Sequence, residues 1–182
     1  MRIAIFGLGY VGISAAACLT ARGHSVIGVD TNLQKVLAIR EGHSPIAEPG
    51  VPEMLRKAAV EGLLSATTSA EEALSECELA FVCVGTPSSA DGSHNMTFIA
   101  EVTRQIAAAC AGRRSSLTVA YRSTIKPGTL EDMVIPTLKC SVGDKFEELI
   151  EVAYNPEFLR EGSAVEDYFD PPKIVIGTVG AK

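Results

Sequence analysis

The sequence has no concentration of positive charge. Lys and Arg number 16 against 22 Asp and Glu, which leaves a net charge of −6, and no run of basic residues occurs in its 182 positions. Surfaces that bind nucleic acid need a basic patch. We therefore expect no nucleic-acid partner.

Long hydrophobic runs are also missing, although 47% of the residues are hydrophobic. No apolar segment approaches the roughly 18 residues that a membrane-spanning helix requires. Met1 lies directly before the first apolar run, at residues 2–6, which leaves no room for a signal peptide. These features predict a cytoplasmic protein with no membrane partner, and the length favours one domain over residues 1–182.

Cysteine and histidine are sparse and show no ligand spacing. The chain has five Cys, an odd number without a C-x-x-C pair, and three His that are scattered singly. Structural zinc sites need clustered Cys and His ligands. We therefore predict reduced thiols that pack as small hydrophobic side chains, and no metal site.

The most informative stretch that is present stands at the start of the chain. Residues 2–6 (RIAIF) predict a short buried strand, residues 7–12 (GLGYVG) fit the pattern G-x-G-x-x-G, and an alanine-rich helical pattern follows at residues 11–21. A glycine motif framed by a strand and a helix indicates a dinucleotide site. The pattern by itself is only weak evidence, and the strand before it and the helix after it make the evidence stronger.

Each glycine of the motif has a predicted role. Gly7 permits the tight turn, Gly9 leaves no side chain between the backbone and a pyrophosphate, and Gly12 lets the helix pack closely on the strand. The helix N-terminus then offers unpaired N–H groups and a partial positive charge to the phosphates.

Strand and helix patterns alternate along the rest of the chain. Further strands are predicted at residues 25–30, 63–67, 79–84, 117–121, 151–154 and 173–177. Helices are predicted at residues 33–41, 51–61, 96–111 and 127–138, with Pro127 in the first turn of the last, and loops at residues 88–95 and 141–148. Ser69 followed by Glu72 is a capping box that predicts one more short helix. This alternation predicts an α/β fold, a doubly wound and mostly parallel Rossmann-type sheet with helices on both faces.

Asp30 ends the second predicted strand, 18 residues beyond Gly12. An acidic residue near this spacing binds the adenosine ribose of a dinucleotide. Its charge would repel the 2′-phosphate of NADP, and no Arg follows at once, so NAD is favoured; the glycine loop alone would also admit FAD. A solvated strand end is the alternative for Asp30, and an ordinary surface lysine is the alternative for Lys35.

Polar residues directly follow three more of the predicted strands. These segments are residues 85–87 (GTP), 122–124 (RST) and 155–162 (NPEFLREG). Carboxyl ends of parallel strands share one edge of a sheet, where ligands bind, so we expect these segments to surround one site.

The candidates in these segments have structural interpretations as well. Thr86 and Thr124 could be turn residues beside Pro87 and Pro127. Two acids of the last segment, at positions 157 and 161, could be favoured there only because they precede a helix.

Together the segments resemble the nucleotide-sugar 6-dehydrogenases, the family of the UDP-glucose and GDP-mannose dehydrogenases. The matching segments are GLGYVG at 7–12, VD at 29–30, SPIAEPG at 44–50, VCVGTP at 82–87, RST at 122–124, PGT at 127–129 and NPEFLREG at 155–162. They span nearly the whole chain, and the last is the most specific. The SPI, RST and FLRE segments favour the GDP-mannose members.

The resemblance implies an enzyme that oxidises the C6 alcohol of a nucleotide sugar to a carboxylate and reduces two NAD. The cofactor contacts that it implies come from Gly7, Gly9, Tyr10, Val11 and Gly12 at the pyrophosphate, Asp30 and Lys35 at the adenosine ribose, and Thr86 and Thr124 near the nicotinamide.

The same resemblance implies roles in the chemistry and in substrate binding. Thr124 and Glu157 would be catalytic and would assist a water and proton relay, for which a carboxylate is a suitable group. Glu161 would contact the sugar nucleotide.

One part of the family pattern has no counterpart here. Family members are longer, with a central helix through which they form homo-oligomers and a second domain that supplies a cysteine nucleophile, a lysine and an asparagine. The thiol holds the aldehyde for the second oxidation, and none of the five Cys has that setting. The chain is therefore expected to be the NAD-binding domain alone, inactive by itself. A free-standing NAD-binding regulatory module and the cofactor domain of a hydroxy-acid-type dehydrogenase are the alternatives.

Overall fold

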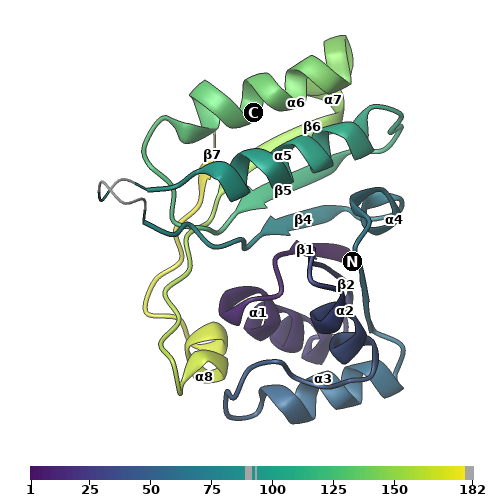
Figure 1. Cartoon of the computed structure of the whole chain (residues 1–182), viewed down its shortest axis with the longest axis vertical. Helices are drawn as coiled ribbons and strands as arrows, with labels where there is room; N and C mark the ends of the chain where they lie inside the picture. Colours follow the sequence, from purple (N-terminus) through teal and green to yellow (C-terminus); the bar gives the residue numbers. More distant parts are fainter. Residues whose placement is uncertain (89–91, 93, 179–182) are drawn as a thin grey trace.

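A central sheet of seven strands, in the order β3-β2-β1-β4-β5-β6-β7, organises the computed structural model, which describes residues 1–88, 92 and 94–178 (Figure 1). The strands are β1 (Arg2–Phe6), β2 (Ser25–Val29), β3 (Leu64–Thr67), β4 (Leu79–Val82), β5 (Leu117–Tyr121), β6 (Ile150–Tyr154) and β7 (Gly177–Thr178). The first six pair in parallel, and β7 pairs antiparallel to β6.

The direction of winding changes at β1. In the described chain β1 pairs with β2 on one side and with β4 on the other, so that Ile3 lies opposite both Val26 and Leu79. The strands that follow β1 in sequence build one half of the sheet, and those from β4 onward build the other. A crevice forms where such winding reverses, and dinucleotides bind there.

Helices cover both faces of the sheet. They are α1 (Tyr10–Ala21), α2 (Leu33–Arg40), α3 (Val51–Val60), α4 (Ala70–Leu74), α5 (Thr97–Cys110), a π-helix (Leu130–Val134) that leads into α6 (Ile135–Val142), a 3-10 turn (Gly143–Lys145), α7 (Phe146–Leu149) and α8 (Ala164–Phe169). In Figure 1, α5 and α6 lie on one side of the sheet, while α1, α2, α3 and α8 lie on the other.

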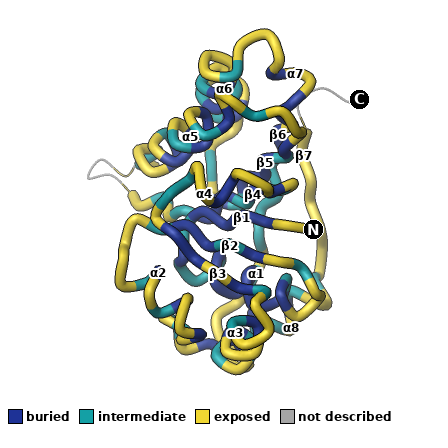
Figure 2. Tube along the Cα trace, turned by 90° about the vertical axis from the view of Figure 1, so that its right-hand side faces the viewer, coloured by how far each residue is buried: buried dark blue, intermediate teal, exposed yellow. Residues whose placement is uncertain are grey.

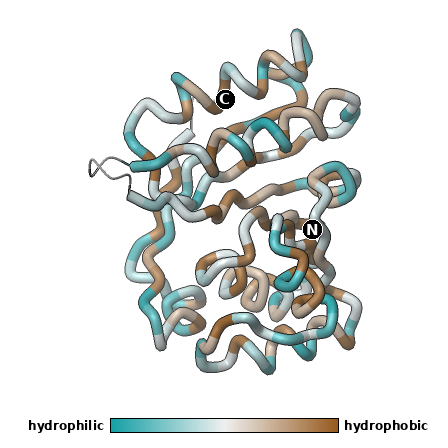
Figure 3. Tube along the Cα trace, in the orientation of Figure 1, coloured by the Kyte–Doolittle hydropathy of each residue, from teal (hydrophilic) through white to brown (hydrophobic). Residues whose placement is uncertain are grey.

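Alternation along the strands divides the core into two layers. In β1, Ala4 and Phe6 pack in the cluster beneath α4, α5 and α6, whereas Ile3 and Ile5 pack in the cluster with α1, α2 and α3. All four side chains are at most 1% exposed, as expected for a parallel strand covered on both faces. Figure 2 shows the strands buried between exposed helix surfaces, and Figure 3 shows hydrophobic residues along the strands and at intervals on the helices.

The predicted fold class is confirmed, and the first six predicted strands match β1 to β6 with shifts of at most two residues at their ends. The helix predicted after Asn32 is also confirmed, because the Asn32 side chain caps α2 by accepting hydrogen bonds from the N–H groups of Gln34 and Lys35.

Two predictions beyond β5 are wrong. Residues 141–148 are predicted to be a loop but are helical, because Leu138, Phe146 and Leu149 anchor this stretch in the core and only its other positions are polar. Pro127 does not begin a helix. It lies in a turn, next to Gly128 at φ +84°, and the π-helix that leads into α6 starts at Leu130.

The final apolar run is also not the strand that its pattern predicts. Within the described part of this stretch, only Gly177–Thr178 pairs, and it does so with the last two residues of β6. Ile174 and Ile176 lie beyond the end of that strand and are 73% and 67% exposed. No helix range was predicted for the residues of α8. The predicted loop at residues 88–95 lies partly outside the described residues.

Candidate functional site

The glycine loop between β1 and α1 adopts its shape because two of its glycines are packed too tightly for any side chain. Gly7 has φ +99°, and a Cβ built on it would lie 2.8 Å from the Cys83 carbonyl oxygen. A Cβ on Gly12 would lie 2.0 Å from the carbonyl oxygen of Gly7. The predicted roles of these two glycines, the tight turn and the close packing of helix on strand, therefore have a steric basis.

Gly9 is different, because the fold itself leaves room for a side chain there. A Cβ on Gly9 would meet no atom of the described residues within 4 Å, and its backbone is extended at φ −91° and ψ −168°. The first N–H groups of a helix have no intrahelical partner. Gly9 is the N-cap of α1 and has no side chain that could accept a hydrogen bond from them. Open space in front of a helix N-terminus suits a phosphate group.

Asp30 lies beside this loop at the end of β2 and is partly buried. Its Oδ2 accepts a hydrogen bond of 2.8 Å from the backbone N–H of Leu8, and its Oδ1 accepts one of 2.9 Å from the N–H of Asn32. The Lys35 Nζ lies 3.5 Å from Oδ2. The carboxylate therefore joins the glycine loop to the start of α2.

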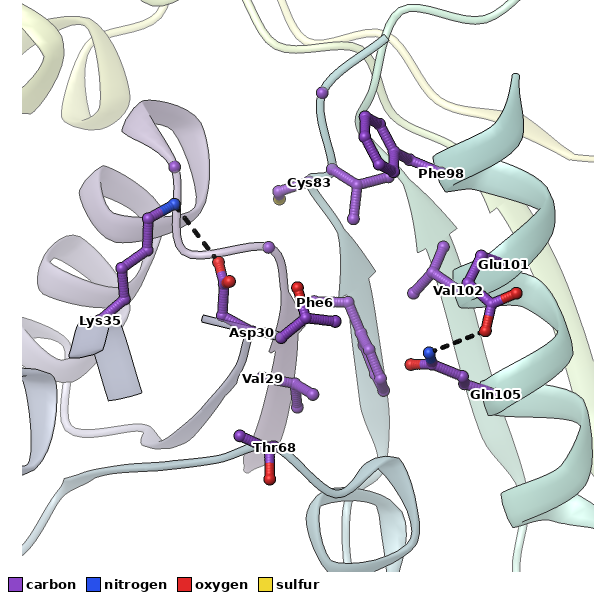
Figure 4. A pocket seen from close by; sticks show the side chains of 15 residues that line it. Phe6, Val29, Asp30, Lys35, Thr68, Cys83, Phe98, Glu101, Val102 and Gln105 are labelled. Atoms are coloured by element: carbon purple, nitrogen blue, oxygen red, sulfur yellow. Dashed lines mark hydrogen bonds and ion pairs between the residues drawn. The ribbon is translucent and has the colours of Figure 1, made fainter. Parts of the chain in front are cut away.

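A cavity of about 230 Å³ opens between Asp30 and α5 (Figure 4). Its lining consists of Phe6, Gly7, Gly9, Val29, Asp30, Thr31, Lys35, Thr68, Cys83, Val84, Gly85, Phe98, Glu101, Val102 and Gln105. Figure 4 shows Asp30 and Lys35 on one wall and the side chains of α5 on the opposite wall. The cavity is mostly apolar with charged groups at its sides, as expected of a pocket for a planar base and its ribose.

The α5 wall of this cavity was not among the predicted site residues. Phe98, Glu101, Val102 and Gln105 recur at intervals of three and four residues, so they share one face of the helix. Phe98 is 53% exposed, and the Gln105 amide donates a hydrogen bond of 3.1 Å to the Glu101 carboxylate. The available sequence signal was the aromatic Phe98 in register with the polar Glu101 and Gln105, whereas Val102 on the same wall also belongs to the core.

A second cavity, of about 240 Å³, lies beyond the ends of β4 to β6. Arg122 lines it, with its guanidinium 5.3 Å from the centre of the Phe81 ring and its Nη1 donating a hydrogen bond of 2.6 Å to Asn155. Glu157 lines the same cavity, and its carboxylate accepts a hydrogen bond of 2.7 Å from the N–H of Leu159. The Arg122 Nε is buried and has no partner among the described residues.

The predicted site residues fall into groups along one edge of the sheet. Gly7, Gly9, Asp30 and Lys35 line the first cavity, and Glu157 lines the second. Tyr10 contacts the loop that carries Glu48, and Val11, in the first turn of α1, packs against the core cluster on that face of the sheet. Thr86 is half-buried and Thr124 exposed, in the loops after β4 and β5, and Glu161 is exposed in a turn after β6.

The cysteines do not form a reactive centre. All five are free, and four of them are buried. Burial raises the pKa of Cys18 to about 12, of Cys77 to about 11 and of Cys83 to about 12, and it also raises the pKa of Cys110. These thiols therefore stay protonated at neutral pH and are poor nucleophiles.

A glycine loop at the switch point, an acid at the end of β2 and a cavity beside them define a dinucleotide-binding domain of the Rossmann type. The chain belongs to the UDP-glucose/GDP-mannose dehydrogenase family: residues 1–182 match the NAD binding domain of that family. NAD is therefore confirmed as the cofactor, and the hydroxy-acid-type alternative is wrong. In the part of the chain that the structure describes, no helix combines the length and the apolar character needed to cross a bilayer.

Named relatives and solved structures are similar over almost the whole chain. GDP-mannose 6-dehydrogenase from Azotobacter vinelandii is 48% identical over 177 residues, which cover 97% of this chain and 41% of the relative. The crystal structure of a ternary complex of GDP-mannose dehydrogenase from Pseudomonas aeruginosa is 45% identical, with a TM-score of 0.95, and the match covers 98% of this chain and 41% of that one.

The UDP-glucose dehydrogenase of Pyrobaculum islandicum is more distant, with 39% identity, a TM-score of 0.90, and coverage of 97% of this chain and 40% of that one. In all three comparisons the chain spans about two fifths of the length of the relative that it matches.

Proposed function

We propose that this chain is the NAD-binding part of a nucleotide-sugar 6-dehydrogenase that oxidises the C6 alcohol of its substrate to a carboxylate with two NAD. The observation that carries the proposal is the cavity at the switch point, where Gly9 leaves open space and Asp30 stands at the wall. The family match supplies the reaction class.

The described residues suit the adenosine and pyrophosphate parts of NAD. Asp30 and Lys35 would contact the adenosine ribose, and the base would lie against the α5 wall. The side chains of Tyr10 and Val11 are engaged elsewhere, so these residues would bind the pyrophosphate through their backbone N–H groups.

The chemistry would take place on the other side of β1, toward the loops after β4 and β5. NAD supplies the hydride acceptor when it is bound. Thr86 and Thr124 would lie near its nicotinamide half. Thr124 and Glu157 would hold and move protons and position a water, and the Glu157 position in the wall of the second cavity supports that role.

GDP-mannose is the favoured substrate over UDP-glucose. The support is the order of similarity, because the A. vinelandii GDP-mannose 6-dehydrogenase is 48% identical and the P. islandicum UDP-glucose dehydrogenase is 39% identical. Glu161 would contact the sugar nucleotide from its exposed position after β6.

The second oxidation needs a nucleophilic thiol that the buried cysteines do not offer. We therefore include in the proposal that residues 1–182 form one NAD-binding domain, which works with a central helix and a further domain in a cytoplasmic homo-oligomer. The greater length of the relatives supports this arrangement.

The proposal is tested by expressing the whole reading frame that contains this sequence and recording NADH formation at 340 nm. We expect two NADH per sugar and a kcat/KM for GDP-mannose at least about tenfold above that for UDP-glucose, equivalent to about 1.4 kcal/mol. A preference for UDP-glucose would overturn the substrate assignment, and no turnover of either sugar would overturn the reaction class. Residues 1–182 alone serve as the control, which should bind NAD without turnover.

A further inference from the structure

The Glu48 carboxylate is buried in the loop between α2 and α3 and joins three segments that are distant in sequence. It is 3% exposed. Its Oε2 accepts hydrogen bonds from the Tyr10 hydroxyl (2.8 Å) and the Gly162 N–H (2.9 Å), and its Oε1 accepts one from the Ala164 N–H (2.8 Å). One side chain thus connects the start of α1 with the segment that carries Glu161.

Tyr10 has a second acceptor within reach. Its hydroxyl lies 3.0 Å from the carbonyl oxygen of Arg160 and 2.8 Å from Glu48. A phenol has one proton to donate, so the hydroxyl can serve only one of these acceptors at a time. Because Tyr10 is the first residue of α1 and follows Gly9, this choice is made next to the predicted pyrophosphate position.

The segment that receives these bonds, residues 160–164, is a tight turn, called here the 160–164 turn. Gly162 has φ +89°, and the N–H of Ser163 donates a hydrogen bond of 3.2 Å to the Arg160 carbonyl. Glu161 is exposed at the tip of this turn. The α8 helix begins at Ala164, the last residue of this turn, and lies beside α1 (Figure 1).

A second buried carboxylate holds the 160–164 turn from its other side. Asp167 is 4% exposed and accepts hydrogen bonds from the Arg160 N–H (2.8 Å), the Arg160 guanidinium (2.6 Å) and the Ser163 hydroxyl (3.2 Å). Both carboxylates therefore fix the turn, but of the two only Glu48 also has a hydrogen bond to α1 among the described residues. Asp167 is therefore a local anchor of the turn, whereas Glu48 connects the turn to the residue that follows the glycine loop.

The charge on Glu48 is well compensated. Burial opposes ionisation of the carboxyl group, but the hydrogen bonds from Gly162, Ala164 and Tyr10 together outweigh it and hold the pKa of Glu48 below its ordinary value. Glutamine in its place would turn an NH2 group toward at least one of these donors, which would lose its acceptor.

We propose that Glu48 is a positioning residue that, through Tyr10, makes the placement of the 160–164 turn and its Glu161 depend on occupation of the NAD site. The inference rests on the proposed function, because contact between Glu161 and a sugar nucleotide is part of that proposal. A ligand shifts an equilibrium only where the two states differ in their interaction with it. In one state the Tyr10 hydroxyl donates its hydrogen bond to Glu48, and in the other it donates to the Arg160 carbonyl. An anion bound at the N-terminus of α1 changes the electric field and the geometry at Tyr10, and so the balance between the two states.

The test uses the chain itself, labelled with ¹⁵N, and NAD as the probe at saturating concentration. The amide signals of Gly162 and Ala164 are followed by NMR in the wild type, in Glu48→Gln, in Tyr10→Phe and in Asp167→Asn. We expect NAD to shift both amides in the wild type and in Asp167→Asn. The shifts should be at least about threefold smaller in Glu48→Gln and in Tyr10→Phe. The Tyr10→Phe variant keeps the hydrogen bonds from the turn to Glu48, so it tests the coupling even if Glu48→Gln fails to fold.

The outcomes separate this inference from the proposed function. If the Gly9 amide responds to NAD while Gly162 and Ala164 do not respond in the wild type, the coupling is refuted and NAD binding stands. Equal loss of the shifts in Glu48→Gln and Asp167→Asn would also refute it, because any loosening of the turn would then suffice. No response anywhere in the wild type would overturn both the proposed function and the inference.

Discussion

The Asp30 carboxylate accepts a hydrogen bond of 2.8 Å from the backbone N–H of Leu8, inside the glycine loop. The residue expected to bind the ribose therefore also holds the loop expected to bind the pyrophosphate. Leu8 in turn fits over Gly28 of β2, where a Cβ would lie 2.6 Å from the Leu8 Cδ2. The two halves of the cofactor site are thus built as one unit at the ends of β1 and β2.

Asp30→Asn should weaken NAD binding by about tenfold or more, because a neutral amide accepts weaker hydrogen bonds from ribose hydroxyls than a carboxylate does, and tenfold corresponds to about 1.4 kcal/mol. The loss for NADP should be smaller, since the repulsion of its 2′-phosphate is removed at the same time. Calorimetric titration of both cofactors checks this. Asp144→Asn, which changes the charge equally at an exposed position outside the cavity, is the control; equal affinities of Asp30→Asn and the wild type would refute the role of Asp30.

Gly9→Ala and Gly12→Ala should separate binding from folding. The Gly9 Cβ would meet no atom of the described chain within 4 Å, so the melting temperature should stay within about 2 °C, while NAD affinity should fall by at least about tenfold. The Gly12 Cβ would lie 2.0 Å from a backbone oxygen, and such overpacking costs about 1–3 kcal/mol. Thermal unfolding and NAD titration of both variants decide the matter. Unchanged NAD affinity of Gly9→Ala would place the pyrophosphate elsewhere.

Phe98→Ala should reduce NAD affinity about threefold to tenfold without loss of stability. The ring is 53% exposed at the cavity wall, so it contributes little to the core, whereas an aromatic contact with the adenine is worth about 0.5–1.5 kcal/mol. Leu37→Ala is the matched control, since Leu37 is 45% exposed on α2 and does not line the cavity. Equal NAD affinities of the two variants would show that the α5 wall does not bind the base.

Asp167 should make the fold sensitive to acid. Hydrogen bonds from Arg160 lower the pKa of Asp167 to about 2, below the value of about 3.9 in an unfolded chain. Its contribution to stability is therefore complete above about pH 4 and is lost as the pH falls toward 2. Urea unfolding at pH 5 and pH 3 should show a smaller loss of stability in Asp167→Asn than in the wild type. Parallel pH dependence in the two proteins would contradict this assignment. Glu48, whose pKa is also lowered, accounts for part of the decline that remains.

Much of the fold could be predicted because its signals are local. Apolar runs such as the one at residues 79–82 and the cap at Asn32 specify their own elements. The helical stretch from Gly143 to Leu149 could not be predicted in this way, since its helicity depends on the packing of Phe146 and Leu149 against the core. The prediction of a strand at residues 173–177 was wrong for the opposite reason. The apolar pattern is present, but β6 ends at Tyr154, so most of this segment has no strand of the described chain to pair with.

The candidate site divides along the same line. Gly7, Gly12 and Asp30 were identifiable because fixed spacing from a strand reflects steric and electrostatic needs. Glu48 was not, because it acts through contacts with residues far away in sequence, as the bond from Gly162 to Glu48 illustrates. The α5 wall offered only the spacing of Phe98, Glu101 and Gln105, which does not by itself show that this face borders a cavity. A buried carboxylate in a turn-rich loop gives no periodic signal.

The most direct test of the central claim is a calorimetric titration of residues 1–182 with NAD and, separately, with NADP. The cavity beside Gly9 and Asp30 predicts one NAD per chain and an affinity for NADP at least about tenfold weaker, a difference of about 1.4 kcal/mol. Absence of binding at millimolar NAD, or equal affinity for the two cofactors, would contradict the assignment of this cavity as the NAD site.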